Sequence, residues 1–369
     1  MVVTLPVIPL IEPWLPAPCG ELVRQQIDSG FVGPGATAQR FAGRIAEISG
    51  VAEAVPVASG TVALSVAAWS LGLKPGDEVV VPAYGVISVI NAFASIGLKP
   101  RLAEIDVATG CIDPRLLDQA ITRRTRAVVH IDFCGSIGPE LDEVAALCEG
   151  RKIPLIEDAA WALGRGRPGR RGGSFGAIGT TSFSVPKIIT TGQGGAVLVH
   201  DPGQRDAAIS AVDQGDVAWR RTNLNRGVGS NLRLSDLAAA LGLAQIDQLP
   251  ERLARKRRVF TVLTGLIGER LFRTSDGEPP SQNIIFVDRP DDAVAALRAQ
   301  GVLAARQYRA MYHHPPFAEL KDRDFPASEF WSGHAVYLPF GVAMDEAAAT
   351  RVGEAARGLN CRFVAPEPA

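Results

Sequence analysis

Two side chains, Asp158 and Lys187, could do chemistry together in a chain whose surrounding residues are mostly inert. Lys187 is the one charged residue in the stretch 181–199, and Asp158 ends the apolar run 153–158. An amine kept in apolar surroundings has a lowered pKa, which makes it a nucleophile toward carbonyl groups. A carboxylate buried at a strand end needs a cationic partner or several donors. Taken alone, Asp158 could equally cap a helix and Lys187 could reach the surface.

A second group of side chains could hold a phosphate. Ser59, Gly60 and Thr61 form a small-residue loop between a short apolar run and a helical pattern. The free backbone N–H groups at a helix start bind phosphate well, and Ser182 adds a hydroxyl five residues before Lys187. These residues could equally be ordinary helix caps.

The phosphate loop, the carboxylate and the amine follow one another in this order along the chain. Together they describe a site for pyridoxal 5'-phosphate (PLP), in which Lys187 would bond the aldehyde of the cofactor and Asp158 would pair with its ring nitrogen. The two residues lie 29 positions apart (187 − 158), which leaves room for a crossover and a strand.

The elements that must position these groups can be read from residues 51–200, where β-branched apolar runs alternate with helical patterns. Strands are predicted at 53–59, 77–84, 97–106, 126–133, 153–158, 179–185 and 195–201. This alternation predicts an α/β fold with a mostly parallel sheet that is covered by helices on both faces. Such sheets bind ligands at the carboxyl ends of their strands, where all of the candidate groups would lie.

The pattern changes near residue 249, where a long basic amphipathic helix begins. Strand-like 283–288 and two more helical patterns follow it. We therefore predict a large domain over residues 1–248, including the N-terminal segment, and a smaller α+β domain over residues 249–369.

Composition excludes several classes of function. The 369 residues carry 38 Lys and Arg against 39 Asp and Glu, a net charge of −1, which argues against a general binder of nucleic acid or of membrane surfaces. The cysteines are scattered, without a CxxC pair, so neither a disulfide framework nor a metal site is expected. They are Cys19, Cys111, Cys134, Cys148 and Cys361. The N-terminus lacks the basic start of a signal peptide, and a cytoplasmic location is expected.

Two stretches imitate other functions. Residues 79–98 are uncharged and long enough to span a membrane, but Pro82 and Gly85 interrupt them, so we interpret them as a strand, a turn and a helix. Residues 33–38 (GPGATA) match a dinucleotide fingerprint, but no strand precedes them and Pro34 lies inside the turn.

Five segments carry a resemblance to a known family. They are ASGTVAL (58–64), LKPGDEVVVPAY (73–84), IEDAAWALG (156–164), SFSVPKIITTGQGGAVLV (182–199) and GSNLRLSDLAAALGLAQI (229–246). In this order they resemble the DegT/DnrJ/StrS-type sugar aminotransferases of the aspartate aminotransferase superfamily, over nearly the whole chain. The resemblance implies a fold type I PLP-dependent transferase, with a mostly parallel seven-stranded sheet and a smaller C-terminal α+β domain. It also implies a homodimer with shared active sites.

The resemblance assigns a role to each matching position. Lys187 would bond the cofactor and later shuttle a proton, and Asp158 would bind the ring nitrogen. The phosphate would be held by Gly60, Thr61 and Ser182, with Ser59 beside them. Asn231 matches an asparagine that reaches the phosphate in the neighbouring subunit.

Three positions depart from the family pattern. Trp161 stands where a glutamine or histidine usually lies near the ring hydroxyl of the cofactor, and an indole N–H can donate there but cannot accept. Val86 stands where an aromatic residue usually stacks on the cofactor, so either Tyr84 or an aliphatic face would cover the ring. Gln193 replaces the glutamate of a GEGG motif.

Several further side chains are candidates for contacting the substrates. Arg220, Arg221 and Arg226 lie near Asn231 in an otherwise net-neutral chain and could bind a diphosphate or a carboxylate, or could belong to a solvated loop. We also consider Tyr308, His313 and His314, for which a structural or surface role is at least as well supported.

These observations predict transfer of an amino group from L-glutamate or L-glutamine to a keto-sugar, nucleotide-linked, in the synthesis of amino sugars, surface glycans or antibiotics. A PLP-dependent dehydratase or a cyclitol aminotransferase could be built on the same scaffold, and so could a catalytically silent regulatory protein. Family members that dehydrate sugars have histidine in place of the lysine, so Lys187 favours amino transfer.

Overall fold

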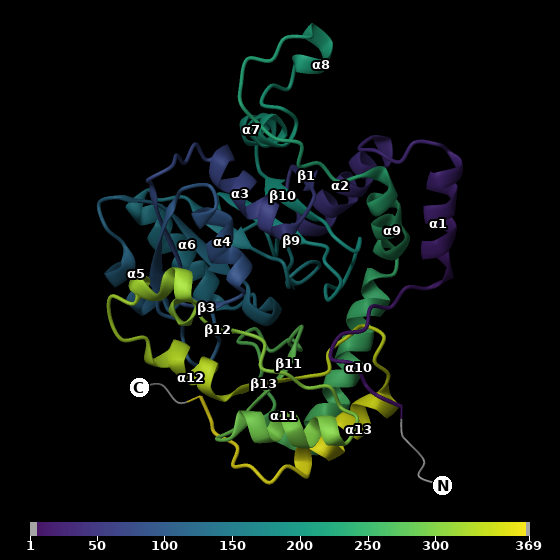
Figure 1. The fold of residues 1–369 in the computed structure, drawn as a ribbon, viewed down its shortest axis with the longest axis vertical. Helices are drawn as coiled ribbons and strands as arrows, with labels where there is room; N and C mark the ends of the chain where they lie inside the picture. Colours follow the sequence, from purple (N-terminus) through teal and green to yellow (C-terminus); the bar gives the residue numbers. More distant parts are fainter. Residues whose placement is uncertain (1–5, 367–369) are drawn as a thin grey trace.

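Seven strands between Glu53 and Val199 form the central sheet of the computed structural model, which describes residues 6–366 (Figure 1). They are β1 (Glu53–Val57), β2 (Glu78–Pro82), β4 (Lys99–Ala103), β5 (Thr125–Ile131), β6 (Leu155–Asp158), β9 (Ile178–Ser182) and β10 (Gly195–Val199). Their spatial order is β1-β10-β9-β6-β5-β2-β4. The strands from β4 to β9 are parallel, and β10 is antiparallel to both β9 and β1. The predicted strands and the mostly parallel sheet are therefore confirmed.

Helices cover both faces of this sheet because successive strand residues point to opposite sides. In β2, Val79 and Val81 pack toward α3 (Gly60–Ser70), α4 (Ile87–Ala94) and α7 (Pro202–Val212). Val80 packs on the other face, toward α5 (Pro114–Ala120) and α6 (Pro139–Arg151). Further along that second face, α2 (Ala36–Ser49) and α9 (Asp236–Ile246) cover β10. Alternating burial of this kind explains why the strands consist of continuous apolar runs.

The stretch that imitates a membrane span is built as predicted. Residues 79–98 contain most of β2, then β3 (Tyr84–Gly85) and α4, and Gly85 has a φ of 150° that permits the turn between strand and helix. Among residues 6–366, no helix combines the length and the hydropathy that a bilayer crossing requires.

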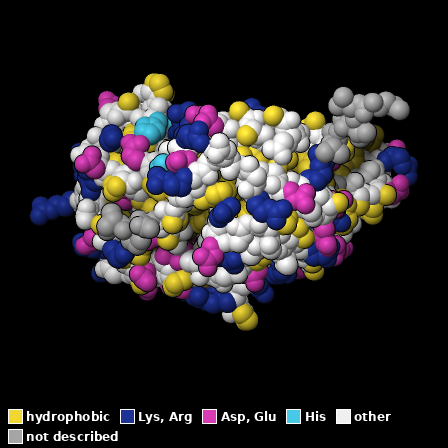
Figure 2. Space-filling view, turned by 90° about the horizontal axis from the view of Figure 1, so that it is seen from below, with side chains coloured by type: hydrophobic (Ala, Val, Ile, Leu, Met, Phe, Trp, Pro, Cys, Tyr) yellow, Lys and Arg dark blue, Asp and Glu magenta, His cyan; other side chains and the backbone are white. Residues whose placement is uncertain are grey.

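The second part of the chain packs below the sheet around its own core (Figure 1). Its elements are α10 (Leu249–Ile267), β11 (Asn283–Phe286), α11 (Pro290–Ala299), β12 (Arg309–Ala310), α12 (Pro326–His334), β13 (Ala335–Leu338) and α13 (Glu346–Arg357). β11 and β13 form an antiparallel pair, and β12 pairs with β3 of the first part. On the side of α11 and α13, basic and acidic side chains are intermingled with hydrophobic ones, in line with the net charge (Figure 2).

The N-terminal segment departs from the expected division of the chain. Ile8 forms a bridge with Val302, and the Phe340 N–H donates to the Leu10 carbonyl at 3.0 Å, so this segment packs with the second part. The start of the N-terminus, on which the prediction about a signal peptide rests, lies outside the described residues, because these begin at residue 6. The boundary at residues 248 and 249 remains a prediction, and it coincides with the start of α10.

The remaining elements are short or peripheral. They are α1 (Ala17–Asp28), α8 (Trp219–Thr222), the β7–β8 hairpin (Gly166–Arg167 and Arg170–Arg171), and the 3-10 helices η1 (Phe133–Gly135), η2 (Gly268–Arg270), η3 (Met311–His313) and η4 (Pro315–Leu320). Figure 1 shows α8 at the tip of a loop that projects beyond α7.

The dinucleotide-like loop 33–38 is closed by the protein itself. Asp236, at the start of α9, is buried, and its Oδ1 accepts the N–H groups of Gly35 and Ala38, each at 2.8 Å. Its Oδ2 accepts the N–H of Thr37 at 3.3 Å. This carboxylate occupies the start of α2, where a dinucleotide pyrophosphate would have to bind.

Substituting Asp236→Asn should therefore destabilise the fold. The amide has one acceptor oxygen and would turn an N–H donor toward the loop, with an expected loss of about 2 kcal/mol in the free energy of unfolding. Urea unfolding followed by circular dichroism measures the loss. Asp247→Asn, on an exposed side chain paired with Arg44, is the matched control and should change stability by less than about 0.5 kcal/mol. Equal effects of the two substitutions would contradict the assignment.

Candidate active site

Lys187 lies on the loop that connects β9 to β10, and this loop is tied down at several points. The Phe183 N–H donates to the Gly194 carbonyl at 2.9 Å, which closes the base of the loop. The side-chain amide of Gln245, fully buried on α9, accepts from the Thr190 N–H at 3.1 Å and donates to the Thr190 carbonyl at 2.7 Å. The loop is thus held to the helix layer, which gives Lys187 a defined position.

The amine of Lys187 is enclosed by apolar groups. The side chain is buried, and Nζ lies 3.4 Å from the centroid of the Trp161 ring, in a cation–π arrangement. Burial lowers the pKa of Lys187 to about 7, although the charges of Asp158 and Cys134 act in the opposite direction. Desolvation therefore outweighs the attraction, and a large fraction of the amine is neutral at physiological pH.

Asp158 ends β6 at the carboxyl edge of the sheet. Its Oδ1 accepts the Ala160 N–H at 3.0 Å, and its backbone carbonyl accepts the Asp132 N–H at 3.1 Å. Burial raises the pKa of Asp158, while the Lys187 amine and the Ala160 N–H oppose the rise. Asp158 and Lys187 therefore act on each other's charge, as the sequence predicted for a functional pair.

The phosphate candidates meet where α3 begins. Ser59 is the N-cap of α3, with its hydroxyl accepting the Val62 N–H at 3.2 Å, while the N–H groups of Gly60 and Thr61 lie in the first turn, where no intrahelical acceptor exists. A Cβ on Gly60 would lie 2.7 Å from the Ser182 Cβ. This contact requires glycine, and it brings the helix start against the hydroxyl at the end of β9.

These groups fit PLP. Asp158 on β6 is in register with Thr180 on the neighbouring strand β9. Ser182 lies two residues beyond Thr180 on β9, so the Cα atoms of Thr180 and Ser182 are about 7 Å apart. A cation-seeking carboxylate, an amine and a phosphate cradle are thus arranged along one sheet edge, as the ring nitrogen, aldehyde and phosphate of PLP require. Val86 lies at the start of α4 and Trp161 beside the amine, and the roles of these residues toward the cofactor stay predictions.

Tyr84 does not take the stacking position. It is fully buried, and its hydroxyl lies 3.0 Å from that of Tyr337. Its ring packs against Phe133 and Trp331 with centroids 5.7 and 5.5 Å away. Because no surface of this ring is accessible, the structure favours the other predicted alternative, an aliphatic face, for which the partly exposed Val86 is the candidate.

Arg220 and Arg221 lie in α8, at the tip of the projecting loop (Figure 1). Asn231 lies at the base of this loop, where it forms a bridge with Asp213 and its neighbour Leu232 accepts the Ala58 N–H at 2.8 Å. Arg220 pairs with Asp213 at 2.9 Å and Arg226 with Asp216 at 3.4 Å, so internal carboxylates compensate two of these charges. Arg221 is exposed. Asn231 is also exposed, and its Oδ1 accepts two hydrogen bonds from Arg233 at 3.1 and 3.0 Å.

The contacts of His313 and His314 are with residues other than Lys187 and Asp158. His313 pairs with Glu329 of α12 at 3.1 Å, and the pKa of the neighbouring His314 is lowered by partial burial and by the charges of Arg309 and His313. Tyr308, in contrast, faces the site. Its hydroxyl accepts from the Gln282 amide at 3.1 Å, and burial together with the Asp158 charge raises its pKa.

The sequence did not reveal that Cys134 and Gln282 belong to this site. The Cys134 thiol donates to the Gln282 Oε1 at 3.5 Å, and Gln282 also bonds Gln307 at 3.1 Å. Cys134 has a φ of 53°, a left-handed conformation that is uncommon for cysteine. No motif marks either residue, because they meet across 148 residues of chain.

The lowered pKa of Lys187 predicts an unusual pH dependence of its reactivity. Covalent capture of added PLP by cofactor-free protein should accelerate as the pH rises to about 7 and then level off, since the neutral amine is the nucleophile. Asp158→Asn removes a charge that raises the pKa of Lys187, so the midpoint should move to lower pH. Stopped-flow absorbance measures the rate. A midpoint near the ordinary lysine value of 10.5 would contradict the assignment, and Lys187→Ala corrects for capture by other amines.

Comparisons with known proteins agree with this geometry. The family model for the DegT/DnrJ/EryC1/StrS aminotransferase family matches residues 19–357. GDP-perosamine synthase from Escherichia coli O157:H7 is 34% identical over 256 residues, which cover 69% of this chain and 70% of that protein. L-glutamine:2-deoxy-scyllo-inosose aminotransferase from Streptoalloteichus tenebrarius is 33% identical over 287 residues, which cover 74% of this chain and 68% of that protein.

The fold agrees as well. The crystal structure of the aminotransferase TlmJ from Streptoalloteichus hindustanus superposes with a TM-score of 0.87 at 27% identity, over 95% of this chain and 98% of that one. PLP is the cofactor of these enzymes, and a solved relative is known in its PMP form. The chain belongs to the DegT/DnrJ/EryC1/StrS aminotransferase family and is a PLP-dependent aminotransferase of fold type I.

Proposed function

We propose that this enzyme transfers the amino group of L-glutamate or L-glutamine to the keto group of a nucleotide-linked sugar, in the cytoplasm, during the synthesis of amino sugars for surface glycans or antibiotics. The observation that carries the proposal is the buried Lys187 amine, whose pKa of about 7 is set by burial next to Asp158. The names of the relatives, a GDP-sugar aminating enzyme and a glutamine-dependent aminotransferase, support the choice of substrates.

PLP, when bound, supplies an aldehyde for the amino group and a ring that accepts the electron pair released at the donor's Cα. The protein's own residues control the protons. Asp158 holds a proton on the ring nitrogen, because a buried carboxylate favours a cation beside it. Lys187 would hold the aldehyde carbon of the cofactor and, when free, would be the base that takes the proton from the donor's Cα and the acid that returns it.

The reverse sequence of the same steps aminates the acceptor. Lys187 would then protonate the carbon that carried the keto oxygen, and the same amine would hold the cofactor once the aminated product has left. A single amine thus acts in both half-reactions, which requires that it be neutral in part and protonated in part at the working pH. A pKa of about 7 meets that requirement.

A cyclitol ketone is the second candidate acceptor. The inosose aminotransferase is nearly as similar to this chain as the GDP-sugar enzyme, at 33% against 34% identity. A dehydratase and a silent regulatory protein are less well supported. Lys187 is retained where dehydrating relatives carry histidine, and the intact pair of Lys187 and Asp158 disfavours a silent scaffold.

A homodimer with shared sites is part of the proposal. Asn231 is exposed at the base of the loop that carries α8, which Figure 1 shows projecting beyond α7. Its Oδ1 accepts hydrogen bonds from Arg233, and we infer that its amide reaches the phosphate of a second copy. The paired arginines of the same loop would accompany it.

Absorption spectroscopy tests the amino transfer. The wild type should form a visible band with added PLP that bleaches on titration with L-glutamate or L-glutamine, while 2-oxoglutarate or its amide accumulates. Lys187→Ala should lack this band, and Asp158→Ala should form it weakly and bleach far more slowly. A protein that stays colourless would refute the proposal. A band that ignores every amino donor would favour dehydration.

Mixing inactive variants tests the shared site. Lys187→Ala and Asn231→Ala should each be inactive or nearly so, yet their mixture should regain activity, because a hybrid dimer holds one site with neither defect. Lys187→Ala mixed with Asp158→Ala is the matched control. Both of its defects fall in the portion of the site built by one chain, so no hybrid site is intact. Equal activity in the two mixtures would contradict the exchange of residues between subunits.

A further inference from the structure

A pocket opens beside Lys187, between the two parts of the chain, and encloses about 740 Å³ of empty space, open solvent included. Pro186 and Ile188, on either side of Lys187, line it from the first part, and α10 lines it from the second. Trp161 is the common wall, because its ring lies against the Lys187 amine and also borders the pocket. A ligand bound here could therefore extend along the Trp161 ring toward the amine.

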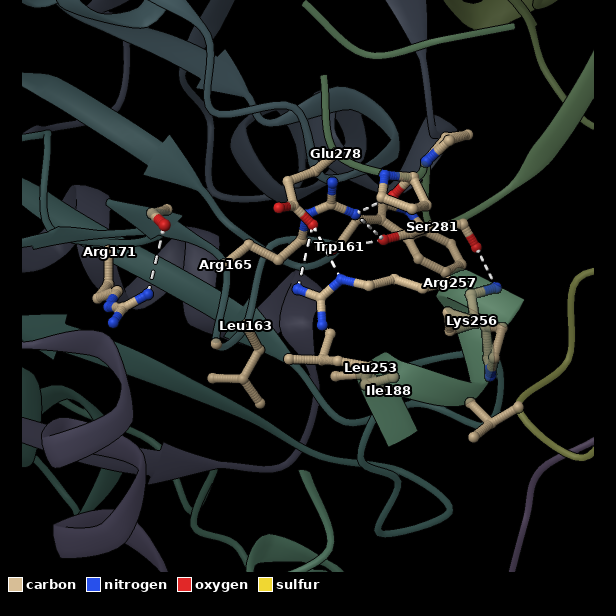
Figure 3. A pocket seen from close by; sticks show the side chains of 16 residues that line it. Trp161, Leu163, Arg165, Arg171, Ile188, Leu253, Lys256, Arg257, Glu278 and Ser281 are labelled. Atoms are coloured by element: carbon tan, nitrogen blue, oxygen red, sulfur yellow. Dashed lines mark hydrogen bonds and ion pairs between the residues drawn. The ribbon is translucent and has the colours of Figure 1, made fainter. Parts of the chain in front are cut away.

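The lining of the pocket is strongly cationic. Arg165, Arg171, Lys256 and Arg257 border it, and Glu278 is the one acidic side chain among the lining residues. Glu278 pairs with Arg257 at 3.2 Å, and both are about half exposed (Figure 3). This leaves a marked excess of positive charge in a protein whose net charge is −1.

Arg165 is the unusual member of the group. Its Nη1 donates to the Pro279 carbonyl at 2.7 Å and to the Ser281 hydroxyl at 3.4 Å (Figure 3). Its Nε and Nη2 are buried, and neither has a hydrogen-bond partner among residues 6–366. No carboxylate in the same residues lies within 4 Å of it. A buried guanidinium with two unused donors carries a large free-energy cost that an anion would remove.

Lys256 adds to the positive potential. Its Nζ donates to the Ser281 carbonyl at 2.7 Å, and burial together with the charge of Arg165 lowers its pKa to about 7. The Cys134 thiol lies within reach of three charges, since Arg165, Lys256 and Lys187 each lower its pKa against the effect of burial. A Cβ on Gly135, next to this thiol, would lie 3.0 Å from the Arg165 Cδ, so the Arg165 side chain passes close to the backbone beside Cys134.

We propose that Arg165 binds an oxyanion of a substrate, either a carboxylate of the amino donor or a phosphate of the acceptor, and holds that substrate against Trp161 with its reacting group at Lys187. The inference rests on the proposed function for the identity of the substrates. Guanidinium nitrogens in a fixed planar fork match carboxylate and phosphate oxygens, which explains why arginine stands here. Because the anion contact lies away from the reacting atoms, Arg165 is a specificity-determining residue and not a proton donor.

Equilibrium binding of two probes, succinate and inorganic pyrophosphate, tests the proposal by calorimetry on the PLP-loaded protein without turnover. At least one probe should bind the wild type, and Arg165→Gln should weaken its binding about tenfold or more. Arg165→Lys, which keeps the charge but loses the fork, should fall between. If Arg165→Gln weakens the binding of succinate, Arg165 binds the carboxylate of the amino donor. If it weakens the binding of pyrophosphate, Arg165 binds a phosphate of the acceptor. Arg258→Gln, an exposed position on α10 paired with Glu251, is the matched control and should change neither affinity.

Glu278→Gln provides a test in the opposite direction. Removing the one acidic side chain of the pocket should strengthen binding of the same probe, by about twofold, which general damage to the fold cannot do. The proposal is overturned if neither probe binds, if Arg165→Gln binds as the wild type does, or if Glu278→Gln weakens binding. Since no catalysis is measured, these outcomes are independent of whether the protein transfers amino groups.

Discussion

The desolvation of one amine is the constraint on which the rest of the site depends. Lys187 can act as a nucleophile near neutral pH because the sheet edge, the helix layer and the Trp161 ring exclude water from it. That exclusion costs free energy, since a charged amine is favoured in water. It persists because the loop that carries Lys187 is closed at its base and bonded to the buried Gln245. Asp158 moderates the cost without cancelling it, so the amine remains divided between its two protonation states.

The same dry interior makes unpaired charges informative. Most arginines of the chain have a carboxylate beside them, including Arg220 and Arg226 of the projecting loop, and these charges are compensated within the protein. Arg165 differs because its partners are a carbonyl and a hydroxyl, which satisfy hydrogen bonds but not charge. Trp161 joins the two regions physically. It faces the amine on one side and the cationic pocket on the other. A substitution that moves the Trp161 ring would therefore alter both regions.

Most of the fold could be predicted because it rests on short-range pattern. Continuous apolar runs predict strands buried on both faces, and the carboxyl ends of parallel strands meet at one edge, which brings Ser59, Asp158 and Ser182 together before any coordinate is known. Tyr84 shows where such reasoning fails. The residue follows a strand, as a ligand-binding side chain often does, but Tyr337, from β13, offers its hydroxyl a partner and the ring is buried.

The sequence by itself determined the α/β class and pointed to a PLP-dependent enzyme, and it predicted the roles of Lys187, Asp158 and the phosphate cradle, because each depends on residue type and on periodicity within one strand–helix unit. Only the tertiary structure decided that residues 8–10 pack with the second part, that Cys134 meets Gln282, and that Arg165 lies against Pro279 without a carboxylate. Each of these contacts joins segments more than 100 residues apart. These long-range contacts depend on how the two hydrophobic cores pack together, and no local sequence pattern predicts them.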